Sequence, residues 1–183
     1  MKIEGRPLAG VWLVSTDVHR DVRGAFYRAF CDQDLEGIWG SRTLRQINVS
    51  QTSQVGAIRG LHWQNPPHGE MKAIRCLRGK VWDVAVDLRA GSPTFLQWFG
   101  QELSPDNGLM LVLGEGYAHG FQAMAPDSEL LYLHSHPYTP SAEAGLRYDD
   151  PQLKISWPLP VTLVSARDLS LPYLEHSWEG IRC

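Results

Sequence analysis

Residues 81–88, VWDVAVDL, alternate between apolar and acidic side chains more clearly than any other segment of the chain. Successive side chains of an extended strand point to opposite faces, so four apolar residues share one face and Asp83 and Asp87 share the other. This pattern predicts a strand with one core face. It makes a β-sheet, not a helix, the element around which the rest of the chain is arranged.

Other short apolar segments repeat this pattern and are separated by glycine and proline turns. The turn at Arg78-Gly79 predicts a hairpin between the strands on either side of it. A short helix is expected only within residues 31–40, and the proline-broken tail from Pro151 is expected to wrap across the body. Many short strands without a long amphipathic helix predict an all-β jelly-roll barrel with short peripheral helices. The expected strands are residues 10–15, 26–30, 45–50, 71–77, 80–88 and 129–138, and residues 94–103 are expected to form a strand pair or a bent strand.

The composition limits the classes of function. The 183 residues, 43% of them hydrophobic, suit a single domain spanning 1–183. With 17 basic and 20 acidic residues the chain has no general field to attract nucleic acid or an anionic membrane. Three widely spaced cysteines form no metal pattern, and the first residues contain no apolar run long enough for a signal peptide. We therefore expect a cytoplasmic protein without nucleic-acid or membrane partners.

Two segments resemble the motifs of the cupin fold. GEGYAHGF resembles the second cupin motif, in which a turn glycine precedes a histidine, here His119. The first motif normally holds a His-x-His pair followed by a glutamate, but here Gln64 follows His62 and Lys72 replaces the glutamate. A glutamine and an ammonium group are poor ligands for a divalent cation. The sequence therefore predicts a cupin-type jelly roll that binds no metal.

Seven motifs occur in the order in which they stand in one enzyme family: DVRGAFYRAF, QINVSQT, IRGLHWQNPP, MKAIRCLRGKVWDVAVDLRAGSPTF, GEGYAHGF, LLYLHSHPYTPSAEAGLRYDDP and SWP. From about Asp21 to Asp168 the chain resembles the dTDP-4-dehydrorhamnose 3,5-epimerase family. The resemblance implies an isomerase of deoxysugar biosynthesis, such as that of rhamnose for polysaccharides. Its substrate would be a nucleoside-diphosphate 4-keto-6-deoxyhexose, and it would need no cofactor.

The resemblance also implies catalytic roles. His62 matches the base, Asp168 the carboxylate that orients the base, and Tyr132 the acid that returns a proton on the opposite face of the sugar. Lys72 matches the lysine beside the C4 carbonyl, and Asp83 lies near that lysine by the same analogy. These groups suit the chemistry, because epimerisation beside a ketone needs a base, a cation to hold the enolate and an acid on the other face.

Further matched positions would bind the substrate. The resemblance implies a homodimer in which an N-terminal strand of one subunit reaches the nucleotide pocket of its neighbour, so that some of these positions act in trans. Arg23 and Arg59 would hold the diphosphate, and the polar side chains of Gln46 and Asn48 would line the nucleotide side. The aromatic ring of Phe26 would pack on the base, and His119 and Tyr138 would line the pocket.

Arg28 departs from the family pattern, which has a glutamate near the nucleobase at this position. An arginine has only donors and would favour the acceptor edge of cytosine or guanine over the N–H of thymine. A CDP- or GDP-linked sugar is therefore an alternative to a dTDP-linked one. In the other interpretation, Arg28 points to solvent or pairs with a neighbouring carboxylate.

Two other functions remain open at this stage. A cupin could bind a sugar nucleotide without turning it over, or it could be a metal-dependent enzyme using His62, His119 and the pair His134 and His136. The last two histidines are better interpreted as wall or surface residues, since the sequence shows no suitably spaced acidic partner. Nothing in the sequence decides whether C3, C5 or both carbons are inverted.

Overall fold

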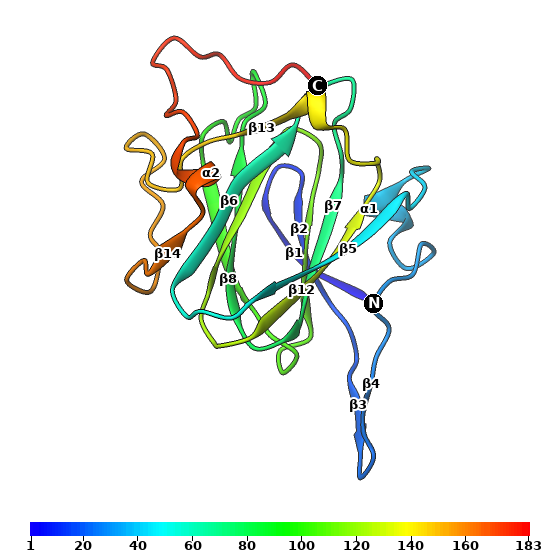
Figure 1. The fold of residues 1–183 in the computed structure, drawn as a ribbon. Coiled ribbons are helices and arrows are strands. Elements are labelled where there is room, and N and C mark those ends of the chain that lie inside the picture. The colour runs from blue at the N-terminus through cyan, green and yellow to red at the C-terminus, as the bar shows by residue number, and fades with distance from the viewer.

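A computed structural model describes all 183 residues and contains two antiparallel sheets that face each other (Figure 1). The two sheets and the mainly β content confirm the jelly-roll barrel that the sequence predicts. The first sheet has the spatial order β1 (Lys2–Leu8), β2 (Val11–Ser15), β10 (Leu109–Leu113), β7 (Lys72–Arg78), β12 (Ser128–His134) and β5 (Gln46–Thr52). The second has the order β13 (Glu143–Gly145), β6 (Ala57–Gln64), β11 (Tyr117–Ala123), β8 (Val81–Asp87) and β9 (Trp98–Leu103), with β14 (Leu163–Val164) parallel to β6.

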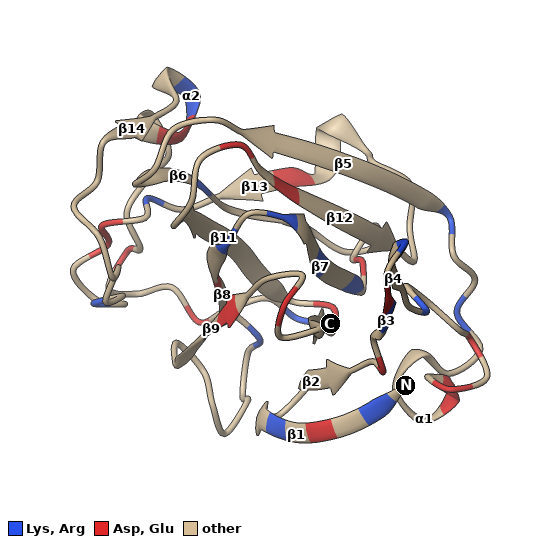
Figure 2. Ribbon diagram, turned by 90° about the horizontal axis from the view of Figure 1, so that it is seen from below, with Lys and Arg blue, Asp and Glu red and all other residues tan.

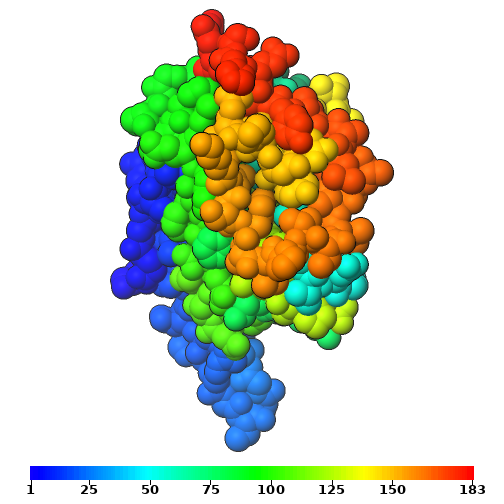
Figure 3. Space-filling view, turned by 90° about the vertical axis from the view of Figure 1, so that its left-hand side faces the viewer, coloured from blue at the N-terminus to red at the C-terminus, as the bar shows by residue number.

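The remaining elements are short and peripheral. A separate hairpin of β3 (His19–Asp21) and β4 (Gly24–Phe26) projects from the body, in blue in Figure 3. The helices are α1 (Glu36–Trp39), α2 (Ala166–Leu169) and the 3-10 turn η1 (Pro140–Ala142). No helix is long and apolar enough to cross a membrane. Acidic and basic residues are interspersed over both sheets and are not gathered on one of them (Figure 2).

Apolar side chains fill the space between the sheets and cover both outer faces. Residues such as Ile74 and Leu111 of the first sheet and Phe121 of the second meet in the central cluster. The segment around α1 covers the outer face of the first sheet. The C-terminal segment covers that of the second, in orange and red in Figure 3, as expected for the tail.

Strand β8 has the core face that the sequence predicts, and its other face is buried as well. Its outer face, with Val84 and Val86, packs under the C-terminal segment. Its inner face carries Asp83 and Asp87, and both are fully buried in the barrel. One face of β8 therefore packs under the C-terminal segment, and the other places two carboxylates beside the apolar cluster between the sheets.

The hairpin predicted at Gly79 does not form. Strand β7 pairs with β10 and β12 in the first sheet, whereas β8 pairs with β9 and β11 in the second. The turn carries the chain from one sheet to the other. Gly79 adopts a φ of 72°, and a Cβ there would lie 2.5 Å from the hydroxyl of Ser128, so the crossing requires glycine.

The strand expected over residues 26–30 is also wrong beyond Phe26, where β4 ends. Tyr27 leaves the extended pattern, and its ring lies 5.5 Å from the guanidinium carbon of Arg75. The aromatic character that suggested a strand serves a contact with a buried cation.

Candidate active site

A pocket of about 770 Å³ opens between the two sheets, a volume typical of small-molecule sites. Strands β5, β7 and β12 form one wall, and β6, β11 and α2 form the other. The structure brings together nine of the residues singled out from the sequence, namely Gln46, Asn48, Arg59, His62, Lys72, His119, Tyr132, Tyr138 and Asp168.

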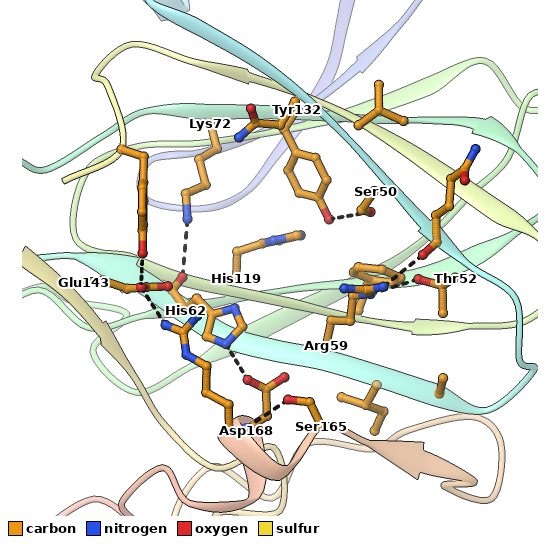
Figure 4. Close-up of a pocket in the computed structure, with 18 of the residues that line it drawn as sticks. Ser50, Thr52, Arg59, His62, Lys72, His119, Tyr132, Glu143, Ser165 and Asp168 are labelled. Atoms are coloured by element: carbon orange, nitrogen blue, oxygen red, sulfur yellow. Dashed lines mark hydrogen bonds and ion pairs between the residues drawn. The ribbon is translucent and has the colours of Figure 1, made fainter. Parts of the chain in front are cut away.

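His62 and Asp168 form a hydrogen-bonded pair on the second wall (Figure 4). The distance between His62 Nε2 and Asp168 Oδ1 is 2.8 Å, and Asp168 Oδ2 accepts a bond from the backbone N–H of Gly60. Burial raises the pKa of the Asp168 carboxyl, but the bond and charge of His62 outweigh it and hold this pKa below its usual value. An ionised Asp168 accepts the proton of Nε2, which leaves Nδ1 with the lone pair that a base requires.

The local backbone fixes both members of this pair. Asp168 lies in the first turn of α2, where Ser165 caps the helix by accepting the N–H of Asp168 at 3.0 Å. On β6, Gly60 has a φ of 113°, and a Cβ there would lie 2.6 Å from the Cα of Gly120 on β11. Two glycines therefore allow the strands to approach closely beside His62.

Lys72 enters the pocket from β7 and is almost buried, with 10% of its side chain exposed. Its Nζ lies 2.9 Å from Glu70 Oε1 and 3.4 Å from the backbone oxygen of His62. The carboxylate of Glu70 thus holds this ammonium in the wall of the pocket. Lys72 can therefore place a positive charge near a ligand oxygen.

Tyr132 faces His62 across the pocket, because it comes from β12 of the first sheet (Figure 4). Its hydroxyl lies 3.4 Å from Ser50 Oγ, and its ring packs edge-on against His119. Burial raises the pKa of the Tyr132 phenol above its ordinary value. The phenol therefore keeps its proton and can serve as an acid.

Asp83 and His119 form a second histidine–carboxylate pair deeper in the barrel. Their Oδ1 and Nε2 atoms lie 2.8 Å apart, and Asp83 is fully buried. Burial raises the pKa of the Asp83 carboxyl, although His119 opposes this. His119 lines the pocket and Asp83 does not, so Asp83 can affect a ligand only through its neighbours.

Arg59 and two amides lie at the β5 side of the pocket. Arg59 donates to Thr52 Oγ1 at 3.0 Å and to the backbone oxygen of Gln51 at 2.9 Å, which fixes its guanidinium beside the opening. Gln46 Oε1 accepts the backbone N–H of Tyr138. Arg59 is thus a cation placed to meet an anionic ligand group.

Three side chains at the other side of the opening form a polar bridge. Glu143 of β13 accepts the hydroxyl of Tyr138 at 2.5 Å, and it lies 2.5 Å from Arg167 of α2. Burial raises the pKa of the Glu143 carboxyl, but these two partners hold it below its usual value. The sequence did not indicate Glu143 or Arg167 as site residues, although Arg167 directly precedes Asp168.

The sequence also did not indicate the partner of His134. Glu70 Oε2 lies 2.8 Å from His134 Nδ1, so an acidic partner does exist, 64 residues away in the chain. His134 lines the pocket at the end of β12, and His136 lies beyond the strand. No spacing rule joins Glu70 to His134, and only the pairing of β7 with β12 brings them together.

The N-terminal candidates lie outside the pocket of their own chain. Arg23 pairs with Asp21 in the projecting hairpin, and Phe26 on the same hairpin is 77% exposed. Arg28 donates to Asp34 at 2.9 Å, which is the pairing with a neighbouring carboxylate considered above. None of these side chains reaches His62 within one subunit.

Three of the four histidines of the metal hypothesis each contact a different carboxylate, and His136 contacts the backbone oxygen of Pro137. His62 pairs with Asp168, His119 with Asp83 and His134 with Glu70. No group of three or more His, Cys, Asp or Glu side chains is placed to hold a metal ion.

The fold and the pocket together define a cupin-type enzyme that can remove a proton from one face of a ligand and return one to the other. A family model described as dTDP-4-dehydrorhamnose 3,5-epimerase matches residues 6–176. The chain belongs to the dTDP-4-dehydrorhamnose 3,5-epimerase family.

Curated relatives and solved structures agree with this assignment. The dTDP-4-dehydrorhamnose 3,5-epimerase of Sinorhizobium fredii is 38% identical over 175 residues, covering 95% of this chain and 90% of that protein. The dTDP-4-dehydrorhamnose 3-epimerase of Streptomyces niveus is 38% identical over 169 residues, covering 92% and 81%. The crystal structure of dTDP-6-deoxy-D-glucose-3,5-epimerase from Legionella pneumophila, in complex with dTDP-4-keto-L-rhamnose, has a TM-score of 0.91 at 34% identity, covering 100% and 98%.

Proposed function

We propose that this protein epimerises a dTDP-linked 4-keto-6-deoxyhexose at a carbon beside the C4 ketone. The observation that carries the proposal is the placement of His62 with Asp168 on one wall and Tyr132 on the other. A base and an acid on opposite sides of a ligand are what inversion of a carbon requires.

The reaction needs two proton transfers. His62 Nδ1 takes the proton from the carbon, and the electron pair of the C–H bond moves into the carbonyl, giving an enolate whose oxygen the Lys72 ammonium stabilises. Tyr132 then donates its hydroxyl proton to the opposite face of the carbon, and the carbonyl re-forms. The imidazolium releases its proton to solvent and the phenolate takes one up, which restores the starting state.

Thymine is the base we propose, for two reasons. The salt bridge to Asp34 occupies Arg28, so its donors have a partner other than cytosine or guanine. The relatives described above carry dTDP in their names, and the L. pneumophila structure holds a dTDP sugar. Arg59 of β6 is the proposed diphosphate ligand, and Gln46 and Asn48 of β5 line the same pocket.

The relatives differ in the carbons that they act on, since one is named a 3,5-epimerase and another a 3-epimerase. Both carbons flank C4, and His62 could reach either if the sugar ring turns in the pocket. We propose C3 as the minimum activity, because both names include it.

A homodimer is the assembly we propose. The β3–β4 hairpin projects from the body with Phe26 and Val22 exposed (Figure 3). Strand β5 lies at the edge of the first sheet, and its Ile47 and Val49 are each 56% exposed. An unpaired edge with apolar side chains suits pairing with a second copy. Arg23 and Phe26 would then reach the partner's nucleotide pocket, and the cytoplasmic location stays a prediction from the sequence.

Solvent exchange tests the activity. The protein is incubated in deuterated water with dTDP-, CDP- and GDP-linked 4-keto-6-deoxyglucose, and deuterium at C3 and C5 is measured by NMR. We expect incorporation at C3 with the dTDP sugar at the highest rate. A lack of exchange with all three sugars would remove the epimerase assignment. Light scattering on a sizing column tests the dimer, and a monomer at micromolar concentration would contradict it.

A further inference from the structure

Glu70, Lys72 and His134 form a cluster of ionisable side chains separate from the His62–Asp168 pair. Glu70 Oε1 lies 2.9 Å from Lys72 Nζ, and Glu70 Oε2 lies 2.8 Å from His134 Nδ1. The exposed fraction of the side chain is 8% for Glu70 and 10% for both Lys72 and His134. One buried carboxylate therefore holds an ammonium with one oxygen and an imidazole with the other.

The sheet geometry produces this cluster. Glu70 lies two residues before Lys72, just ahead of β7, and its carboxylate reaches the ammonium. His134 is the register partner of Lys72 in the pairing of β12 with β7. Side chains at directly paired positions lie next to each other on one face of the sheet. Glu70 thus reaches one neighbour along its own chain and another across the strands.

The charges agree with this arrangement. Burial raises the pKa of the Glu70 carboxyl, but the hydrogen bond from His134 and the charge of Lys72 outweigh it and hold this pKa below its ordinary value. Glu70 is therefore ionised at neutral pH. The other ionisable side chains that line the pocket are His62 and Arg59 of β6, His119 of β11 backed by Asp83 of β8, Tyr132 of β12, Tyr138, Glu143 of β13, and Arg167 and Asp168 of α2.

His134 also touches the nucleotide side of the pocket. Its Nδ1 donates to Glu70, and its Nε2 lies 3.5 Å from the side-chain nitrogen of Asn48 on β5. An amide nitrogen is a donor, so Nε2 is placed to accept from Asn48. A continuous chain of contacts thus runs from Lys72 through Glu70 and His134 to Asn48.

We propose that Glu70 and His134 are positioning residues for Lys72: Glu70 keeps the ammonium aimed across the pocket, and His134 fixes the carboxylate that does so. The inference rests on the proposed function, because the target of the ammonium is the C4 carbonyl oxygen. A lysine side chain is long and flexible, so without Glu70 only the backbone oxygen of His62 at 3.4 Å would restrain Lys72. A buried ammonium without its carboxylate also favours the neutral form.

The first test is Glu70→Gln, with turnover of the dTDP 4-keto sugar measured from pH 6 to 10. We expect kcat to fall about 10- to 100-fold, because a misplaced stabilising group has costs of this size, while KM changes little. The alkaline limb of the profile should move down by about one pH unit, since Lys72 loses its proton sooner. An unchanged kcat and pH profile, with only the melting temperature lowered, would overturn the proposal and leave Glu70 a structural residue.

Two variants of His134 keep the test independent of how Glu70→Gln folds. His134→Asn retains an N–H near the position of Nδ1 and should keep most of the activity, whereas His134→Leu removes the donor and should lose it. Equal activities in these two variants would also overturn the proposal. Glu102→Gln is the matched control, because it removes a carboxylate that pairs with Lys80 on the surface. It should leave kcat and the pH profile as in the wild type.

A measurement without substrate separates this proposal from the proposed function. The ¹³Cε signal of Lys72 is assigned with Lys72→Met in lysine-labelled protein and titrated in the wild type and in Glu70→Gln. The proposal requires the titration to occur at lower pH in Glu70→Gln. Identical curves would overturn it even in an active enzyme, and a shifted curve would support it even if no 4-keto sugar is turned over.

Discussion

His62 Nε2 and Asp168 Oδ1 lie 2.8 Å apart, although 106 residues separate them in the chain. This contact decides which ring nitrogen can act as the base, because the proton on Nε2 is held by the carboxylate and Nδ1 keeps its lone pair. The helix cap at Ser165 and the glycine contact at Gly60 fix the two partners from opposite sides. The reactivity of His62 therefore depends on two segments that lie far apart in the chain, β6 and α2 with its cap.

Replacing Asp168 tests that relationship. In Asp168→Asn the amide no longer stabilises an imidazolium, so we expect kcat to fall about 10²- to 10⁴-fold with little change in KM. Initial rates with the dTDP 4-keto sugar give both constants. His62→Ala should abolish turnover and serves as the reference for complete loss. If Asp168→Asn retained wild-type kcat, His62 would not depend on Asp168.

Replacing Tyr132 separates the two proton transfers. Tyr132→Phe keeps the ring against His119 but removes the acid, so inversion should be about 10²- to 10³-fold slower. Abstraction by His62 should persist, and deuterium should enter the recovered substrate with its configuration retained. NMR of the sugar after incubation in deuterated water shows both. Loss of all exchange in Tyr132→Phe would mean that Tyr132 also takes part in the first step.

Arg59 is expected to act in binding and not in chemistry. Arg59→Ala removes a cation placed beside the opening of the pocket, and a hydrogen bond to a charged group contributes about 1.5–3 kcal/mol. KM and the Kd for dTDP, measured by calorimetry, should therefore rise about 10- to 100-fold while kcat changes little. Arg59→Lys retains the positive charge, so its KM and Kd should lie between those of the wild type and those of Arg59→Ala. A fall in kcat with unchanged Kd would contradict this role.

Acid stability depends in part on Asp87, which lies at the far end of β8. Burial raises the pKa of the Asp87 carboxyl, but hydrogen bonds from Arg89, Ser92 and Thr94 outweigh it and lower this pKa to about 2. The folded value lies below the unfolded value of about 3.9, so Asp87 stabilises the fold above that pH. This contribution is lost as the pH falls from about 4 to about 2.

Asp87→Asn should therefore lower the free energy of unfolding at pH 7 by about 3 kcal/mol, as expected for breaking a buried ion pair. Its stability should also fall less steeply than that of the wild type between pH 4 and 2. Urea unfolding at several pH values measures both effects. Asp106→Asn is the control, because Asp106 is exposed and pairs with Arg20 only at 3.4 Å. Parallel pH curves for Asp87→Asn and the wild type would exclude this role of Asp87.

The sequence predicted the strands well and their partners poorly. The alternation of residues 81–88 identifies β8, because successive side chains of any strand point to opposite faces, whatever its neighbours are. The turn at Gly79 shows where the chain reverses but not which sheet it enters, because that depends on contacts with strands far away in the chain. For the same reason the alternation does not show that Asp83, on the face opposite the apolar one, lies inside the barrel.

The pocket residues divide in a similar way. Residues in distinctive motifs, such as His62 and Tyr132, were found through the family resemblance, and the structure brings them to one pocket. Glu70 and Glu143 were missed because their importance depends on which side chains lie across the strands from them. Register is set by the whole sheet and cannot be obtained from the spacing of one segment.

The crossing turn at Gly79 has a consequence for how activity is gained during folding. Lys72 precedes the turn and belongs to one sheet, His62 and His119 belong to the other, and Asp168 arrives only with the C-terminal segment. Neither sheet can hold a working set of groups alone, and contacts between distant segments form late and slowly. Recovery of turnover on refolding should thus report complete closure of the barrel, and a fragment that lacks either sheet or the tail should show none.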